Sequence, residues 1–446
     1  MANYILLERI ELNASAASVV FSNIPQTGYT DLKVVLSVRN ASSGIGTVRM
    51  GFNGSTASNY NYRQMQGNGA SVSSSAGTSA ASTANEVALT DGNTSTASTF
   101  SNSEIYIPNY TSSTAKSWSA DSVEEENATT AYSRLTAGLW TLTNAISSIT
   151  FTLDAGSFDT NSTFSLYGLA ALGTTPAIAP KAAGGNVIDY DGTYWIHTFR
   201  TSGTFTPQTG LTCDYLVVAG GAGGGGNNGG GGGGAGGLRS TVTATGGGGS
   251  LESALSLVSG TAYTVTVGGG GTAGASSNGG AGSNSVFSTI TSTGGGGGGS
   301  DSGAGGNGGS GGGAGRNRSD NGTGTANQGY AGGDGAGSPS FPTGGGGGAN
   351  AVGANATGSK GGDGGAGVAT SISGSSVTYA GGGGGGSGNS SGTIGTGGAG
   401  GGGNGEGPST GPVAGTTNTG GGGGGGKDNP AGGAGGSGIV IVRYLA

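Results

Sequence analysis

Long runs of consecutive glycine fill the second half of this sequence and limit what the chain can fold into. The chain has 446 residues, of which 111 are glycine, and unbroken runs lie at 229–234, 294–299, 381–386 and 420–426. These runs have no side chains from which to build a hydrophobic core, and glycine loses more conformational entropy on ordering than any other residue. Disorder is therefore the simplest expectation for such a tract.

Apolar segments inside and after the glycine runs favour an ordered domain instead. The segments "AYTVTV", "SVFSTITST" and "SVTYA" end abruptly on glycine, and the chain closes with "GIVIVRYLA". A flexible spacer has no need of strand-like segments at these places. We expect residues 216–218 to pair with the closing segment.

The ordered form that suits a glycine run is the polyproline-II type of helix, which has three residues per turn and rises ~3.1 Å per residue. Collagen is excluded, because the Gly-X-Y period is not kept and the chain has only 10 prolines. The helix has no internal hydrogen bonds, so its N–H and C=O groups must pair with neighbouring chains. We predict a slab of polyglycine-II rods flanked by β-strands.

Residues 1–172 predict a different, all-β domain, in which short apolar segments alternate with turns rich in Ser, Thr, Asn and Gly. Within "SITFTLDA", Ile149, Phe151 and Leu153 face one way, as on one face of a sandwich. We expect residues 68–98 to form an extended surface loop and the acidic run 124–126 to be solvated. Strands are expected at 4–12, 18–25, 31–40, 46–54, 103–110, 132–140, 147–156 and 164–172, which suggests a jelly-roll-like β-sandwich.

The two parts meet in a segment without pattern. Residues 174–185, "TTPAIAPKAAGG", carry two prolines and no apolar periodicity, as is typical of a linker. We predict a sandwich at 1–172, a linker at 173–185 and a glycine-rich domain at 186–446.

Composition excludes several classes of function. The net charge is −7, and no cluster of Lys and Arg is present that could neutralise phosphates, so we expect no nucleic-acid partner. Cys213 and His197 are the single cysteine and histidine, so no zinc or disulfide pattern exists, and we predict no metal or cofactor. No stretch approaches the ~20 apolar residues of a membrane span. The start lacks a basic region, which indicates synthesis in the cytoplasm without a signal peptide.

Catalytic motifs are weak. "VVAGGAGGGG" imitates a dinucleotide-binding loop, but glycine runs cannot supply the helix that must follow it. His197 is best interpreted as a residue on a sheet face. Asp154, Asp159, Asp189 and Asp191 stay open as glycosidase carboxylates, although no pair can be assigned from the sequence. We predict that the protein is not an enzyme, with a glycan depolymerase as a remote alternative.

Two stretches resemble bacteriophage proteins. "VVFSNIPQTGYTDLKVVLSVRN" with "FSLYGLAAL" resembles the N-terminal β-domain of phage tail-fibre and appendage proteins. "YWIHTFRTSGTFTP", "DYLVVAGGAGGGG" and "GGSGIVIVRYL" resemble the glycine-rich domain that ends many phage tail and surface proteins. The resemblance implies a virion protein made in the host cytoplasm and released on lysis, with other virion proteins as partners. A homotrimer is left open.

We therefore expect a tail fibre or adhesin that binds a host surface glycan or outer-membrane protein. A capsid head fibre or decoration protein is the alternative, and an ice-binding polyglycine slab is more remote. Loops displayed on a rigid scaffold carry function, so contact should fall on segments that interrupt the glycine runs. The candidate receptor-contact residues are Arg316, Arg318, Asp320, Tyr330, Phe341, Lys427 and Asp428.

Overall fold

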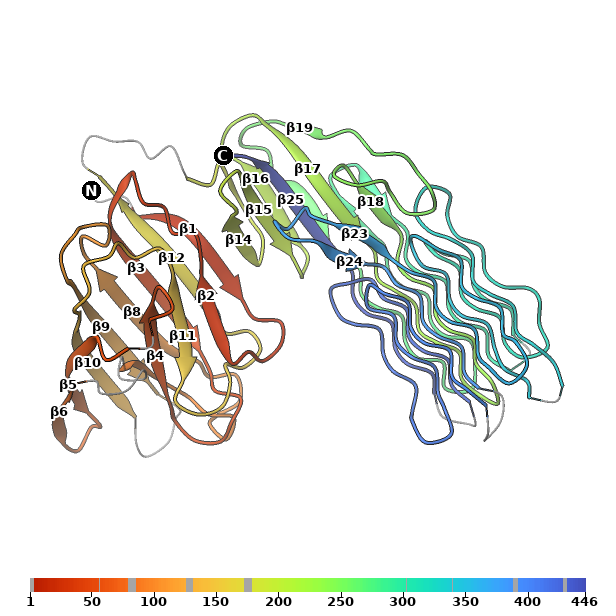
Figure 1. Cartoon of the computed structure of the whole chain (residues 1–446), viewed down its shortest axis with the longest axis horizontal. Coiled ribbons are helices and arrows are strands. Elements are labelled where there is room, and N and C mark those ends of the chain that lie inside the picture. Colours follow the sequence, from red (N-terminus) through yellow and green to blue (C-terminus); the bar gives the residue numbers. More distant parts are fainter. Residues whose placement is uncertain are drawn as a thin grey trace. The chain divides into compact units, whose positions relative to one another are not determined.

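The fold is described from a computed structural model. It describes residues 4–55, 57–78, 86–125, 131–171, 179–301, 303–338, 340–387, 392–427 and 431–446. Every regular element among these residues is a β-strand, and the strands form several sheets with antiparallel pairing (Figure 1), so the predicted all-β class is confirmed.

The chain divides into two compact units. Unit 1 comprises Met1–Lys181, Asn186–Trp195 and Ala446, and unit 2 comprises Ala182–Gly185 and Ile196–Leu445. Residues 172–178, which hold the expected end of the first domain and the start of the linker, lie outside the described residues. The predicted boundaries therefore stay predictions.

Unit 1 consists of two antiparallel sheets. One has the order β14-β1-β12-β3-β8-β9-β10-β5-β6 and the other the order β2-β11-β4-β7. The bounds are β1 (Tyr4–Glu11), β2 (Ser18–Phe21), β3 (Tyr29–Val38), β4 (Gly46–Phe52), β5 (Tyr60–Gly67), β6 (Val72–Thr78), β7 (Glu86–Thr90), β8 (Ser101–Ile107), β9 (Lys116–Glu124), β10 (Tyr132–Trp140), β11 (Ile149–Leu153), β12 (Thr163–Ala170) and β14 (Val187–Tyr190).

The two sheets of unit 1 share one hydrophobic core. Ile149, Phe151 and Leu153 of β11 are buried, while the threonines between them are partly exposed, as the alternation predicted. The ring centroid of Phe151 lies 5.8 Å from that of Phe164, which belongs to β12 of the other sheet. Residues that alternate along each strand thus meet between the sheets, as in a sandwich.

Two expectations for unit 1 are wrong. Residues 68–98 are not one surface loop, because they contain β6 and β7, and Val87 of β7 is fully buried. A serine-rich segment such as β6 can still pair through its backbone, whereas β7 is a short apolar segment that follows a long polar tract. Of the acidic run 124–126, Glu124 is not solvated, because it ends β9, in which every second residue from Lys116 onward is buried. Glu125 is exposed as expected, and residue 126 lies outside the described residues. Because side chains alternate between the two faces of a strand, Glu124 lies on the buried face of β9.

The strands of unit 2 form two principal sheets. β18, β17, β25 and β15 are neighbours in one, β13-β16-β20-β21-β22 is the order of the other, and β23 pairs with β24. The bounds are β13 (Ala182–Ala183), β15 (Tyr194–Phe199), β16 (Gly203–Pro207), β17 (Leu211–Val218), β18 (Leu238–Ser240), β19 (Leu255–Leu257), β20 (Tyr263–Thr266), β21 (Ser285–Phe287), β22 (Ile290–Ser292), β23 (Val368–Thr370), β24 (Val377–Tyr379) and β25 (Ile439–Leu445).

The predicted pairing of the closing segment is confirmed. β25 runs antiparallel to β17, with Leu216 opposite Ile441 and Val218 opposite Ile439. All four of these side chains are at least 95% buried. The glycine-rich tract thus begins after β17 ends at Val218, and the chain returns to the same sheet at β25.

The first glycine-rich segment, 219–226, contains two alanines and forms hydrogen bonds to three neighbouring segments in turn. Gly220, Gly223 and Gly226 donate backbone hydrogen bonds to the 277–283 segment, while Gly221 and Gly224 donate to the 433–436 segment. The N–H groups of residues 219, 222 and 225 bond to a third neighbour, 231–237. Successive residues therefore point their N–H groups to different neighbours, and the direction repeats every three residues.

The run at 230–237 lies at the centre of this network. Its residues are buried, and its N–H groups donate in rotation to three neighbouring segments, while its carbonyls accept from three others. Neither an α-helix nor a β-sheet gives a chain this many bonded neighbours. The segments that accept are 420–426, 293–299 and 344–347, and those that donate are 219–225, 310–313 and 383–386.

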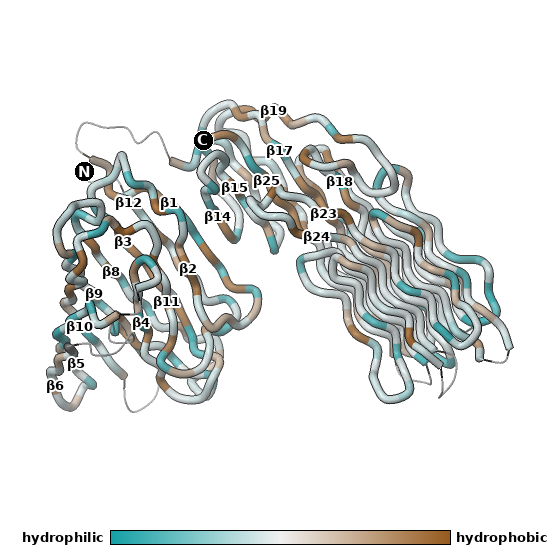
Figure 2. Tube along the Cα trace, viewed as in Figure 1, coloured by the Kyte–Doolittle hydropathy of each residue, from teal (hydrophilic) through white to brown (hydrophobic). Residues whose placement is uncertain are grey.

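Glycine is required in these runs because neighbouring backbones occupy the space of a side chain. A Cβ atom added at Gly232 would lie 2.1 Å from the carbonyl oxygen of Gly383, and one at Gly233 would lie 2.2 Å from that of Ala222. Figure 2 shows the consequence: the runs of unit 2 are pale, while strongly coloured residues lie in the strands and turns. The glycine runs of unit 2 are held together by backbone bonds, whereas unit 1 is held together by side chains.

Two adjacent glycines provide a matched test of this packing. Gly269 and Gly270 are both exposed, but a Cβ at Gly270 would lie 2.0 Å from the carbonyl oxygen of Gly435, whereas one at Gly269 would contact nothing within 4 Å. We expect Gly270→Ala to destabilise unit 2 by about 1–3 kcal/mol, the usual cost of overpacking. Gly269→Ala should be neutral or stabilising by up to about 1 kcal/mol. Thermal unfolding measures both, and equal shifts would contradict the packing.

Candidate functional site

The glycine runs of unit 2 have two ends, a near end that adjoins β-strands and a far end that consists of turns. At the near end the runs continue into β17, β18 and β25. At the far end, turns connect them, and these turns are adjacent: the N–H of Asp301 donates to the carbonyl of Asn227, and Asn317 donates to Ala336. The far end thus gathers side chains from segments that are distant in sequence.

Two predicted contact residues meet at the far end. The guanidinium of Arg316 lies over the ring of Phe341, 5.6 Å from its centroid, and the same guanidinium is paired with Asp301. We call Asp301, Arg316 and Phe341 the far-end cluster. Phe341 has a φ of 47°, which is rare for a bulky residue, so packing in the turn holds it in a strained conformation. Such strain is often found at binding sites.

The other predicted contact residues are dispersed. Arg318 and Asp320 form an exposed ion pair with each other, and the bond from Arg318 lowers the pKa of Asp320. Lys427 is buried, and its N–H donates to a carboxylate oxygen of Glu406. Asp428 lies outside the described residues.

Tyr330 lies away from the far-end cluster. Its N–H donates to the carbonyl of Gly348, and its hydroxyl lies next to Gly248, where an added Cβ would be 2.9 Å from it. Gly248 belongs to the segment that follows β18, so Tyr330 lies at the near end.

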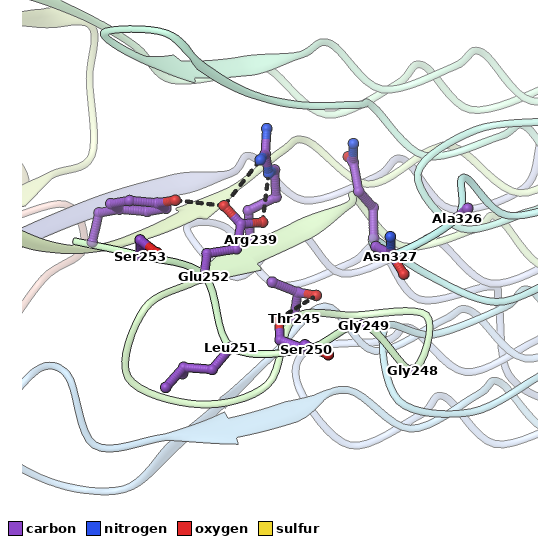
Figure 3. Close-up of a pocket in the computed structure, with 12 residues that line it drawn as sticks. Arg239, Thr245, Gly248, Gly249, Ser250, Leu251, Glu252, Ser253, Ala326 and Asn327 are labelled. Carbon is purple, nitrogen blue, oxygen red and sulfur yellow. Dashed lines mark hydrogen bonds and ion pairs between the residues drawn. The ribbon is translucent and has the colours of Figure 1, made fainter. Parts of the chain in front are cut away.

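A polar groove lies beside this segment at the near end. It has a volume of about 710 Å³ and is lined by residues from β17 and β18, the 245–253 segment and residues 326–328. Figure 3 shows Arg239 and Glu252 on one side, Ala326 and Asn327 on the other, and Thr245 and Ser250 between them. No motif in the sequence indicates this groove, because its residues are ordinary polar types from separate segments.

A charged network forms one wall of the groove. Nε of Arg239 donates to Oε1 of Glu252 at 2.7 Å, and Nη2 donates to Oε2 at 2.9 Å. The hydroxyl of Tyr215 also donates to this carboxylate. The Glu252 contact raises the pKa of Arg239, while burial and the hydrogen bond to Glu252 raise that of Tyr215. These bonds hold the Glu252 carboxylate in a fixed position against Arg239 and Tyr215.

The aspartates left open as catalytic groups have structural contacts. Asp154 accepts from the N–H of Thr47, Asp159 forms an ion pair with Arg39, and Asp191 accepts from the N–H groups of its own turn.

Asp189 faces Glu8 inside unit 1. Burial, and then the charge of Asp189, raises the pKa of Glu8 to about 9. The cavity beside them has a volume of about 10 Å³, which is room for about one water molecule and none for a sugar ring. This carboxyl pair has no access for a glycan.

His197 belongs to β15, as the prediction of a residue on a sheet face implies, and it is fully buried in unit 2. Its Nδ1 lies 2.7 Å from the carbonyl oxygen of Gly184, and its Nε2 lies 3.0 Å from the hydroxyl of Tyr444. The carbonyl can only accept, so Nδ1 carries the proton and Nε2 accepts from Tyr444. Burial lowers the pKa of His197 to about 4, although the bond to Gly184 opposes this.

This histidine predicts how the stability of unit 2 depends on pH. Between pH 6.5 and about 4 the unfolded chain binds a proton at His197 that the folded chain does not, so stability falls as the pH is lowered through this window. The contribution is on the order of 3 kcal/mol. Because the chain has one histidine, its NMR signal is unambiguous and should not titrate between pH 8 and 5. A midpoint near 6.5 would show that the ring is solvated.

The described residues offer few other functional features. They contain no group of three or more His, Cys, Asp or Glu side chains that could hold a metal ion. None of them lies in a helix of the length and apolarity that crossing a lipid bilayer requires. Cys213 is buried, and burial raises the pKa of its thiol to about 12.

Comparison with known proteins identifies the second part of the chain. No curated protein matches the sequence, and no solved structure matches the fold. The family model described as a glycine-rich domain matches residues 199–445, which is more than half of the chain and nearly all of unit 2. The chain therefore belongs to the glycine-rich domain family.

Proposed function

We propose that the protein is a structural component of a phage virion, a tail fibre or adhesin that binds the host cell surface through the far end of unit 2. Unit 1, as a jelly-roll-like sandwich, attaches to other virion proteins. The protein is made in the host cytoplasm and released on lysis. The resemblance of both parts of the sequence to phage appendage proteins supports this proposal.

The proposal includes the form of the glycine runs, which we infer to be polyglycine-II rods. The rotation of hydrogen bonds with a period of three supports this, because polyproline-II helices have three residues per turn. The central run at 230–237, bonded on all sides, supports it further. Such a lattice is rigid, since moving one rod breaks bonds to several neighbours.

The observation that carries the proposal is the contrast between the runs and their far-end turns. The runs offer only backbone. The far-end cluster offers a guanidinium that contacts both a carboxylate and an aromatic ring. Arginine and aromatic residues dominate the binding energy of interfaces. An aromatic ring can stack on a sugar, and an arginine can bind an acidic group. The ligand is a host surface glycan or outer-membrane protein.

Binding of the purified protein to host cells tests this proposal. We expect Arg316→Ala combined with Phe341→Gly to reduce binding at least tenfold, because the cation and the ring are both removed. Glycine accepts the positive φ of residue 341, so this change removes the ring without adding backbone strain. The melting temperature should change little.

The matched control is Arg63→Ala with Met65→Ala, which removes an exposed cation and an exposed apolar side chain from unit 1. This variant should bind cells normally. Loss of binding in the control but not in the far-end variant would move the contact to unit 1. Density on the capsid in images of antibody-labelled particles would favour the head-fibre alternative.

A further inference from the structure

The polar groove at the near end has the features of a second binding site. Its volume of about 710 Å³ lies within the range of about 300–1,000 Å³ that is usual for small-ligand pockets. Its floor is set by β17 and β18, whose backbones are fixed by pairing with each other at residues 216–218 and 238–240. The groove is therefore a feature of the rigid part of unit 2.

The chemistry of the lining selects the class of ligand. Of the residues that line the groove, only Arg239 and Glu252 are charged, and they neutralise each other. An anionic or cationic ligand would meet no net opposite charge. A ligand with many hydroxyl groups could instead donate to carboxylate and amide oxygens and accept from guanidinium, amide and hydroxyl groups.

Several polar groups in the groove have capacity for such bonds. The Oε1 atom of Gln328 accepts from the N–H of Thr293 at 2.8 Å, which fixes the side chain and leaves its NH₂ group as a donor. Asn327 is exposed in a left-handed conformation with a φ of 60° at the tip of a turn. Ser250 and Ser253 add hydroxyls, and Leu251, 58% exposed, adds an apolar surface.

From this combination we propose that the groove binds a neutral oligosaccharide. Fixed planar polar side chains and one apolar contact suit the alternating hydroxyl and C–H surfaces of a sugar ring. The lining is too polar for a hydrophobic peptide. This inference goes beyond the proposed function, because the groove lies at the end of the glycine runs opposite to the far-end cluster.

The test uses the full-length protein on an array of neutral and acidic oligosaccharides, with affinities of the bound sugars then measured by calorimetry. We expect at least one neutral oligosaccharide to bind. Ser253→Trp should weaken this binding at least tenfold, because the exposed serine at the groove is replaced by a ring that fills it. Ser276→Trp places the same ring on an exposed turn at the far end and should have no effect.

A second variant tests the chemistry of the wall. Glu252→Gln keeps the shape of the side chain but removes the charge that neutralises Arg239, so neutral sugar binding should weaken and acidic sugars should bind better. The Arg316→Ala and Phe341→Gly variant should keep its affinity for the neutral sugar. If the far-end variant still bound host cells, the far-end proposal would fail, but the expected effects on sugar binding in the groove would be unchanged.

Three results would overturn the inference. They are an array on which no neutral sugar binds, an affinity that survives Ser253→Trp in protein with a normal melting temperature, and neutral sugar binding that is lost in the far-end variant alone.

Discussion

Hydrogen bonding between the backbones of glycine runs is the constraint on which unit 2 depends. The N–H groups of the 219–226 and 230–237 segments donate to other segments of the chain, so each segment depends on its neighbours for its backbone hydrogen bonds. The run at 230–237 meets this need by bonding to neighbours on every side. The arrangement is possible only where every neighbouring backbone can approach to hydrogen-bond distance, which explains why the tract contains so little besides glycine.

The same constraint explains why strands enclose the glycine tract. Ordering glycine is entropically costly, and no single inter-run bond offsets that cost, so the lattice must form cooperatively. β17 and β25 bring the two ends of the tract into one sheet, with an apolar core that includes Tyr215 and Phe287. These strands supply the hydrophobic burial that the runs lack, and they fix the register from which the runs extend.

The sequence predicted what depends on local pattern and missed what depends on tertiary contacts. The all-β class, the alternation around Phe151 and the pairing of β17 with β25 follow from apolar periodicity. β6 was missed because its serine content resembles a loop, β7 because its short apolar segment follows a long polar tract, and Glu124 because a short acidic run usually is solvated. At the site, the sequence identified Arg316 and Phe341 as turn residues but could not show that they meet. The groove has no sequence signature, because a fold, not a motif, brings Arg239 and Gln328 together.

The separation of scaffold from recognition follows from these physical limits. At most glycines in the interior of the runs an added side chain would collide with a carbonyl oxygen about 2 Å away, so chemical variety is concentrated in the turns and the flanking strands. Substitutions in a far-end turn leave the inter-run bonds untouched, so the proposed binding surface can change without a cost to the lattice. At the near end the strands restrict such change, because Tyr215 and Arg239 also hold the sheet and its loop in place. If both proposals hold, the far end suits a ligand that varies, and the groove suits one that does not.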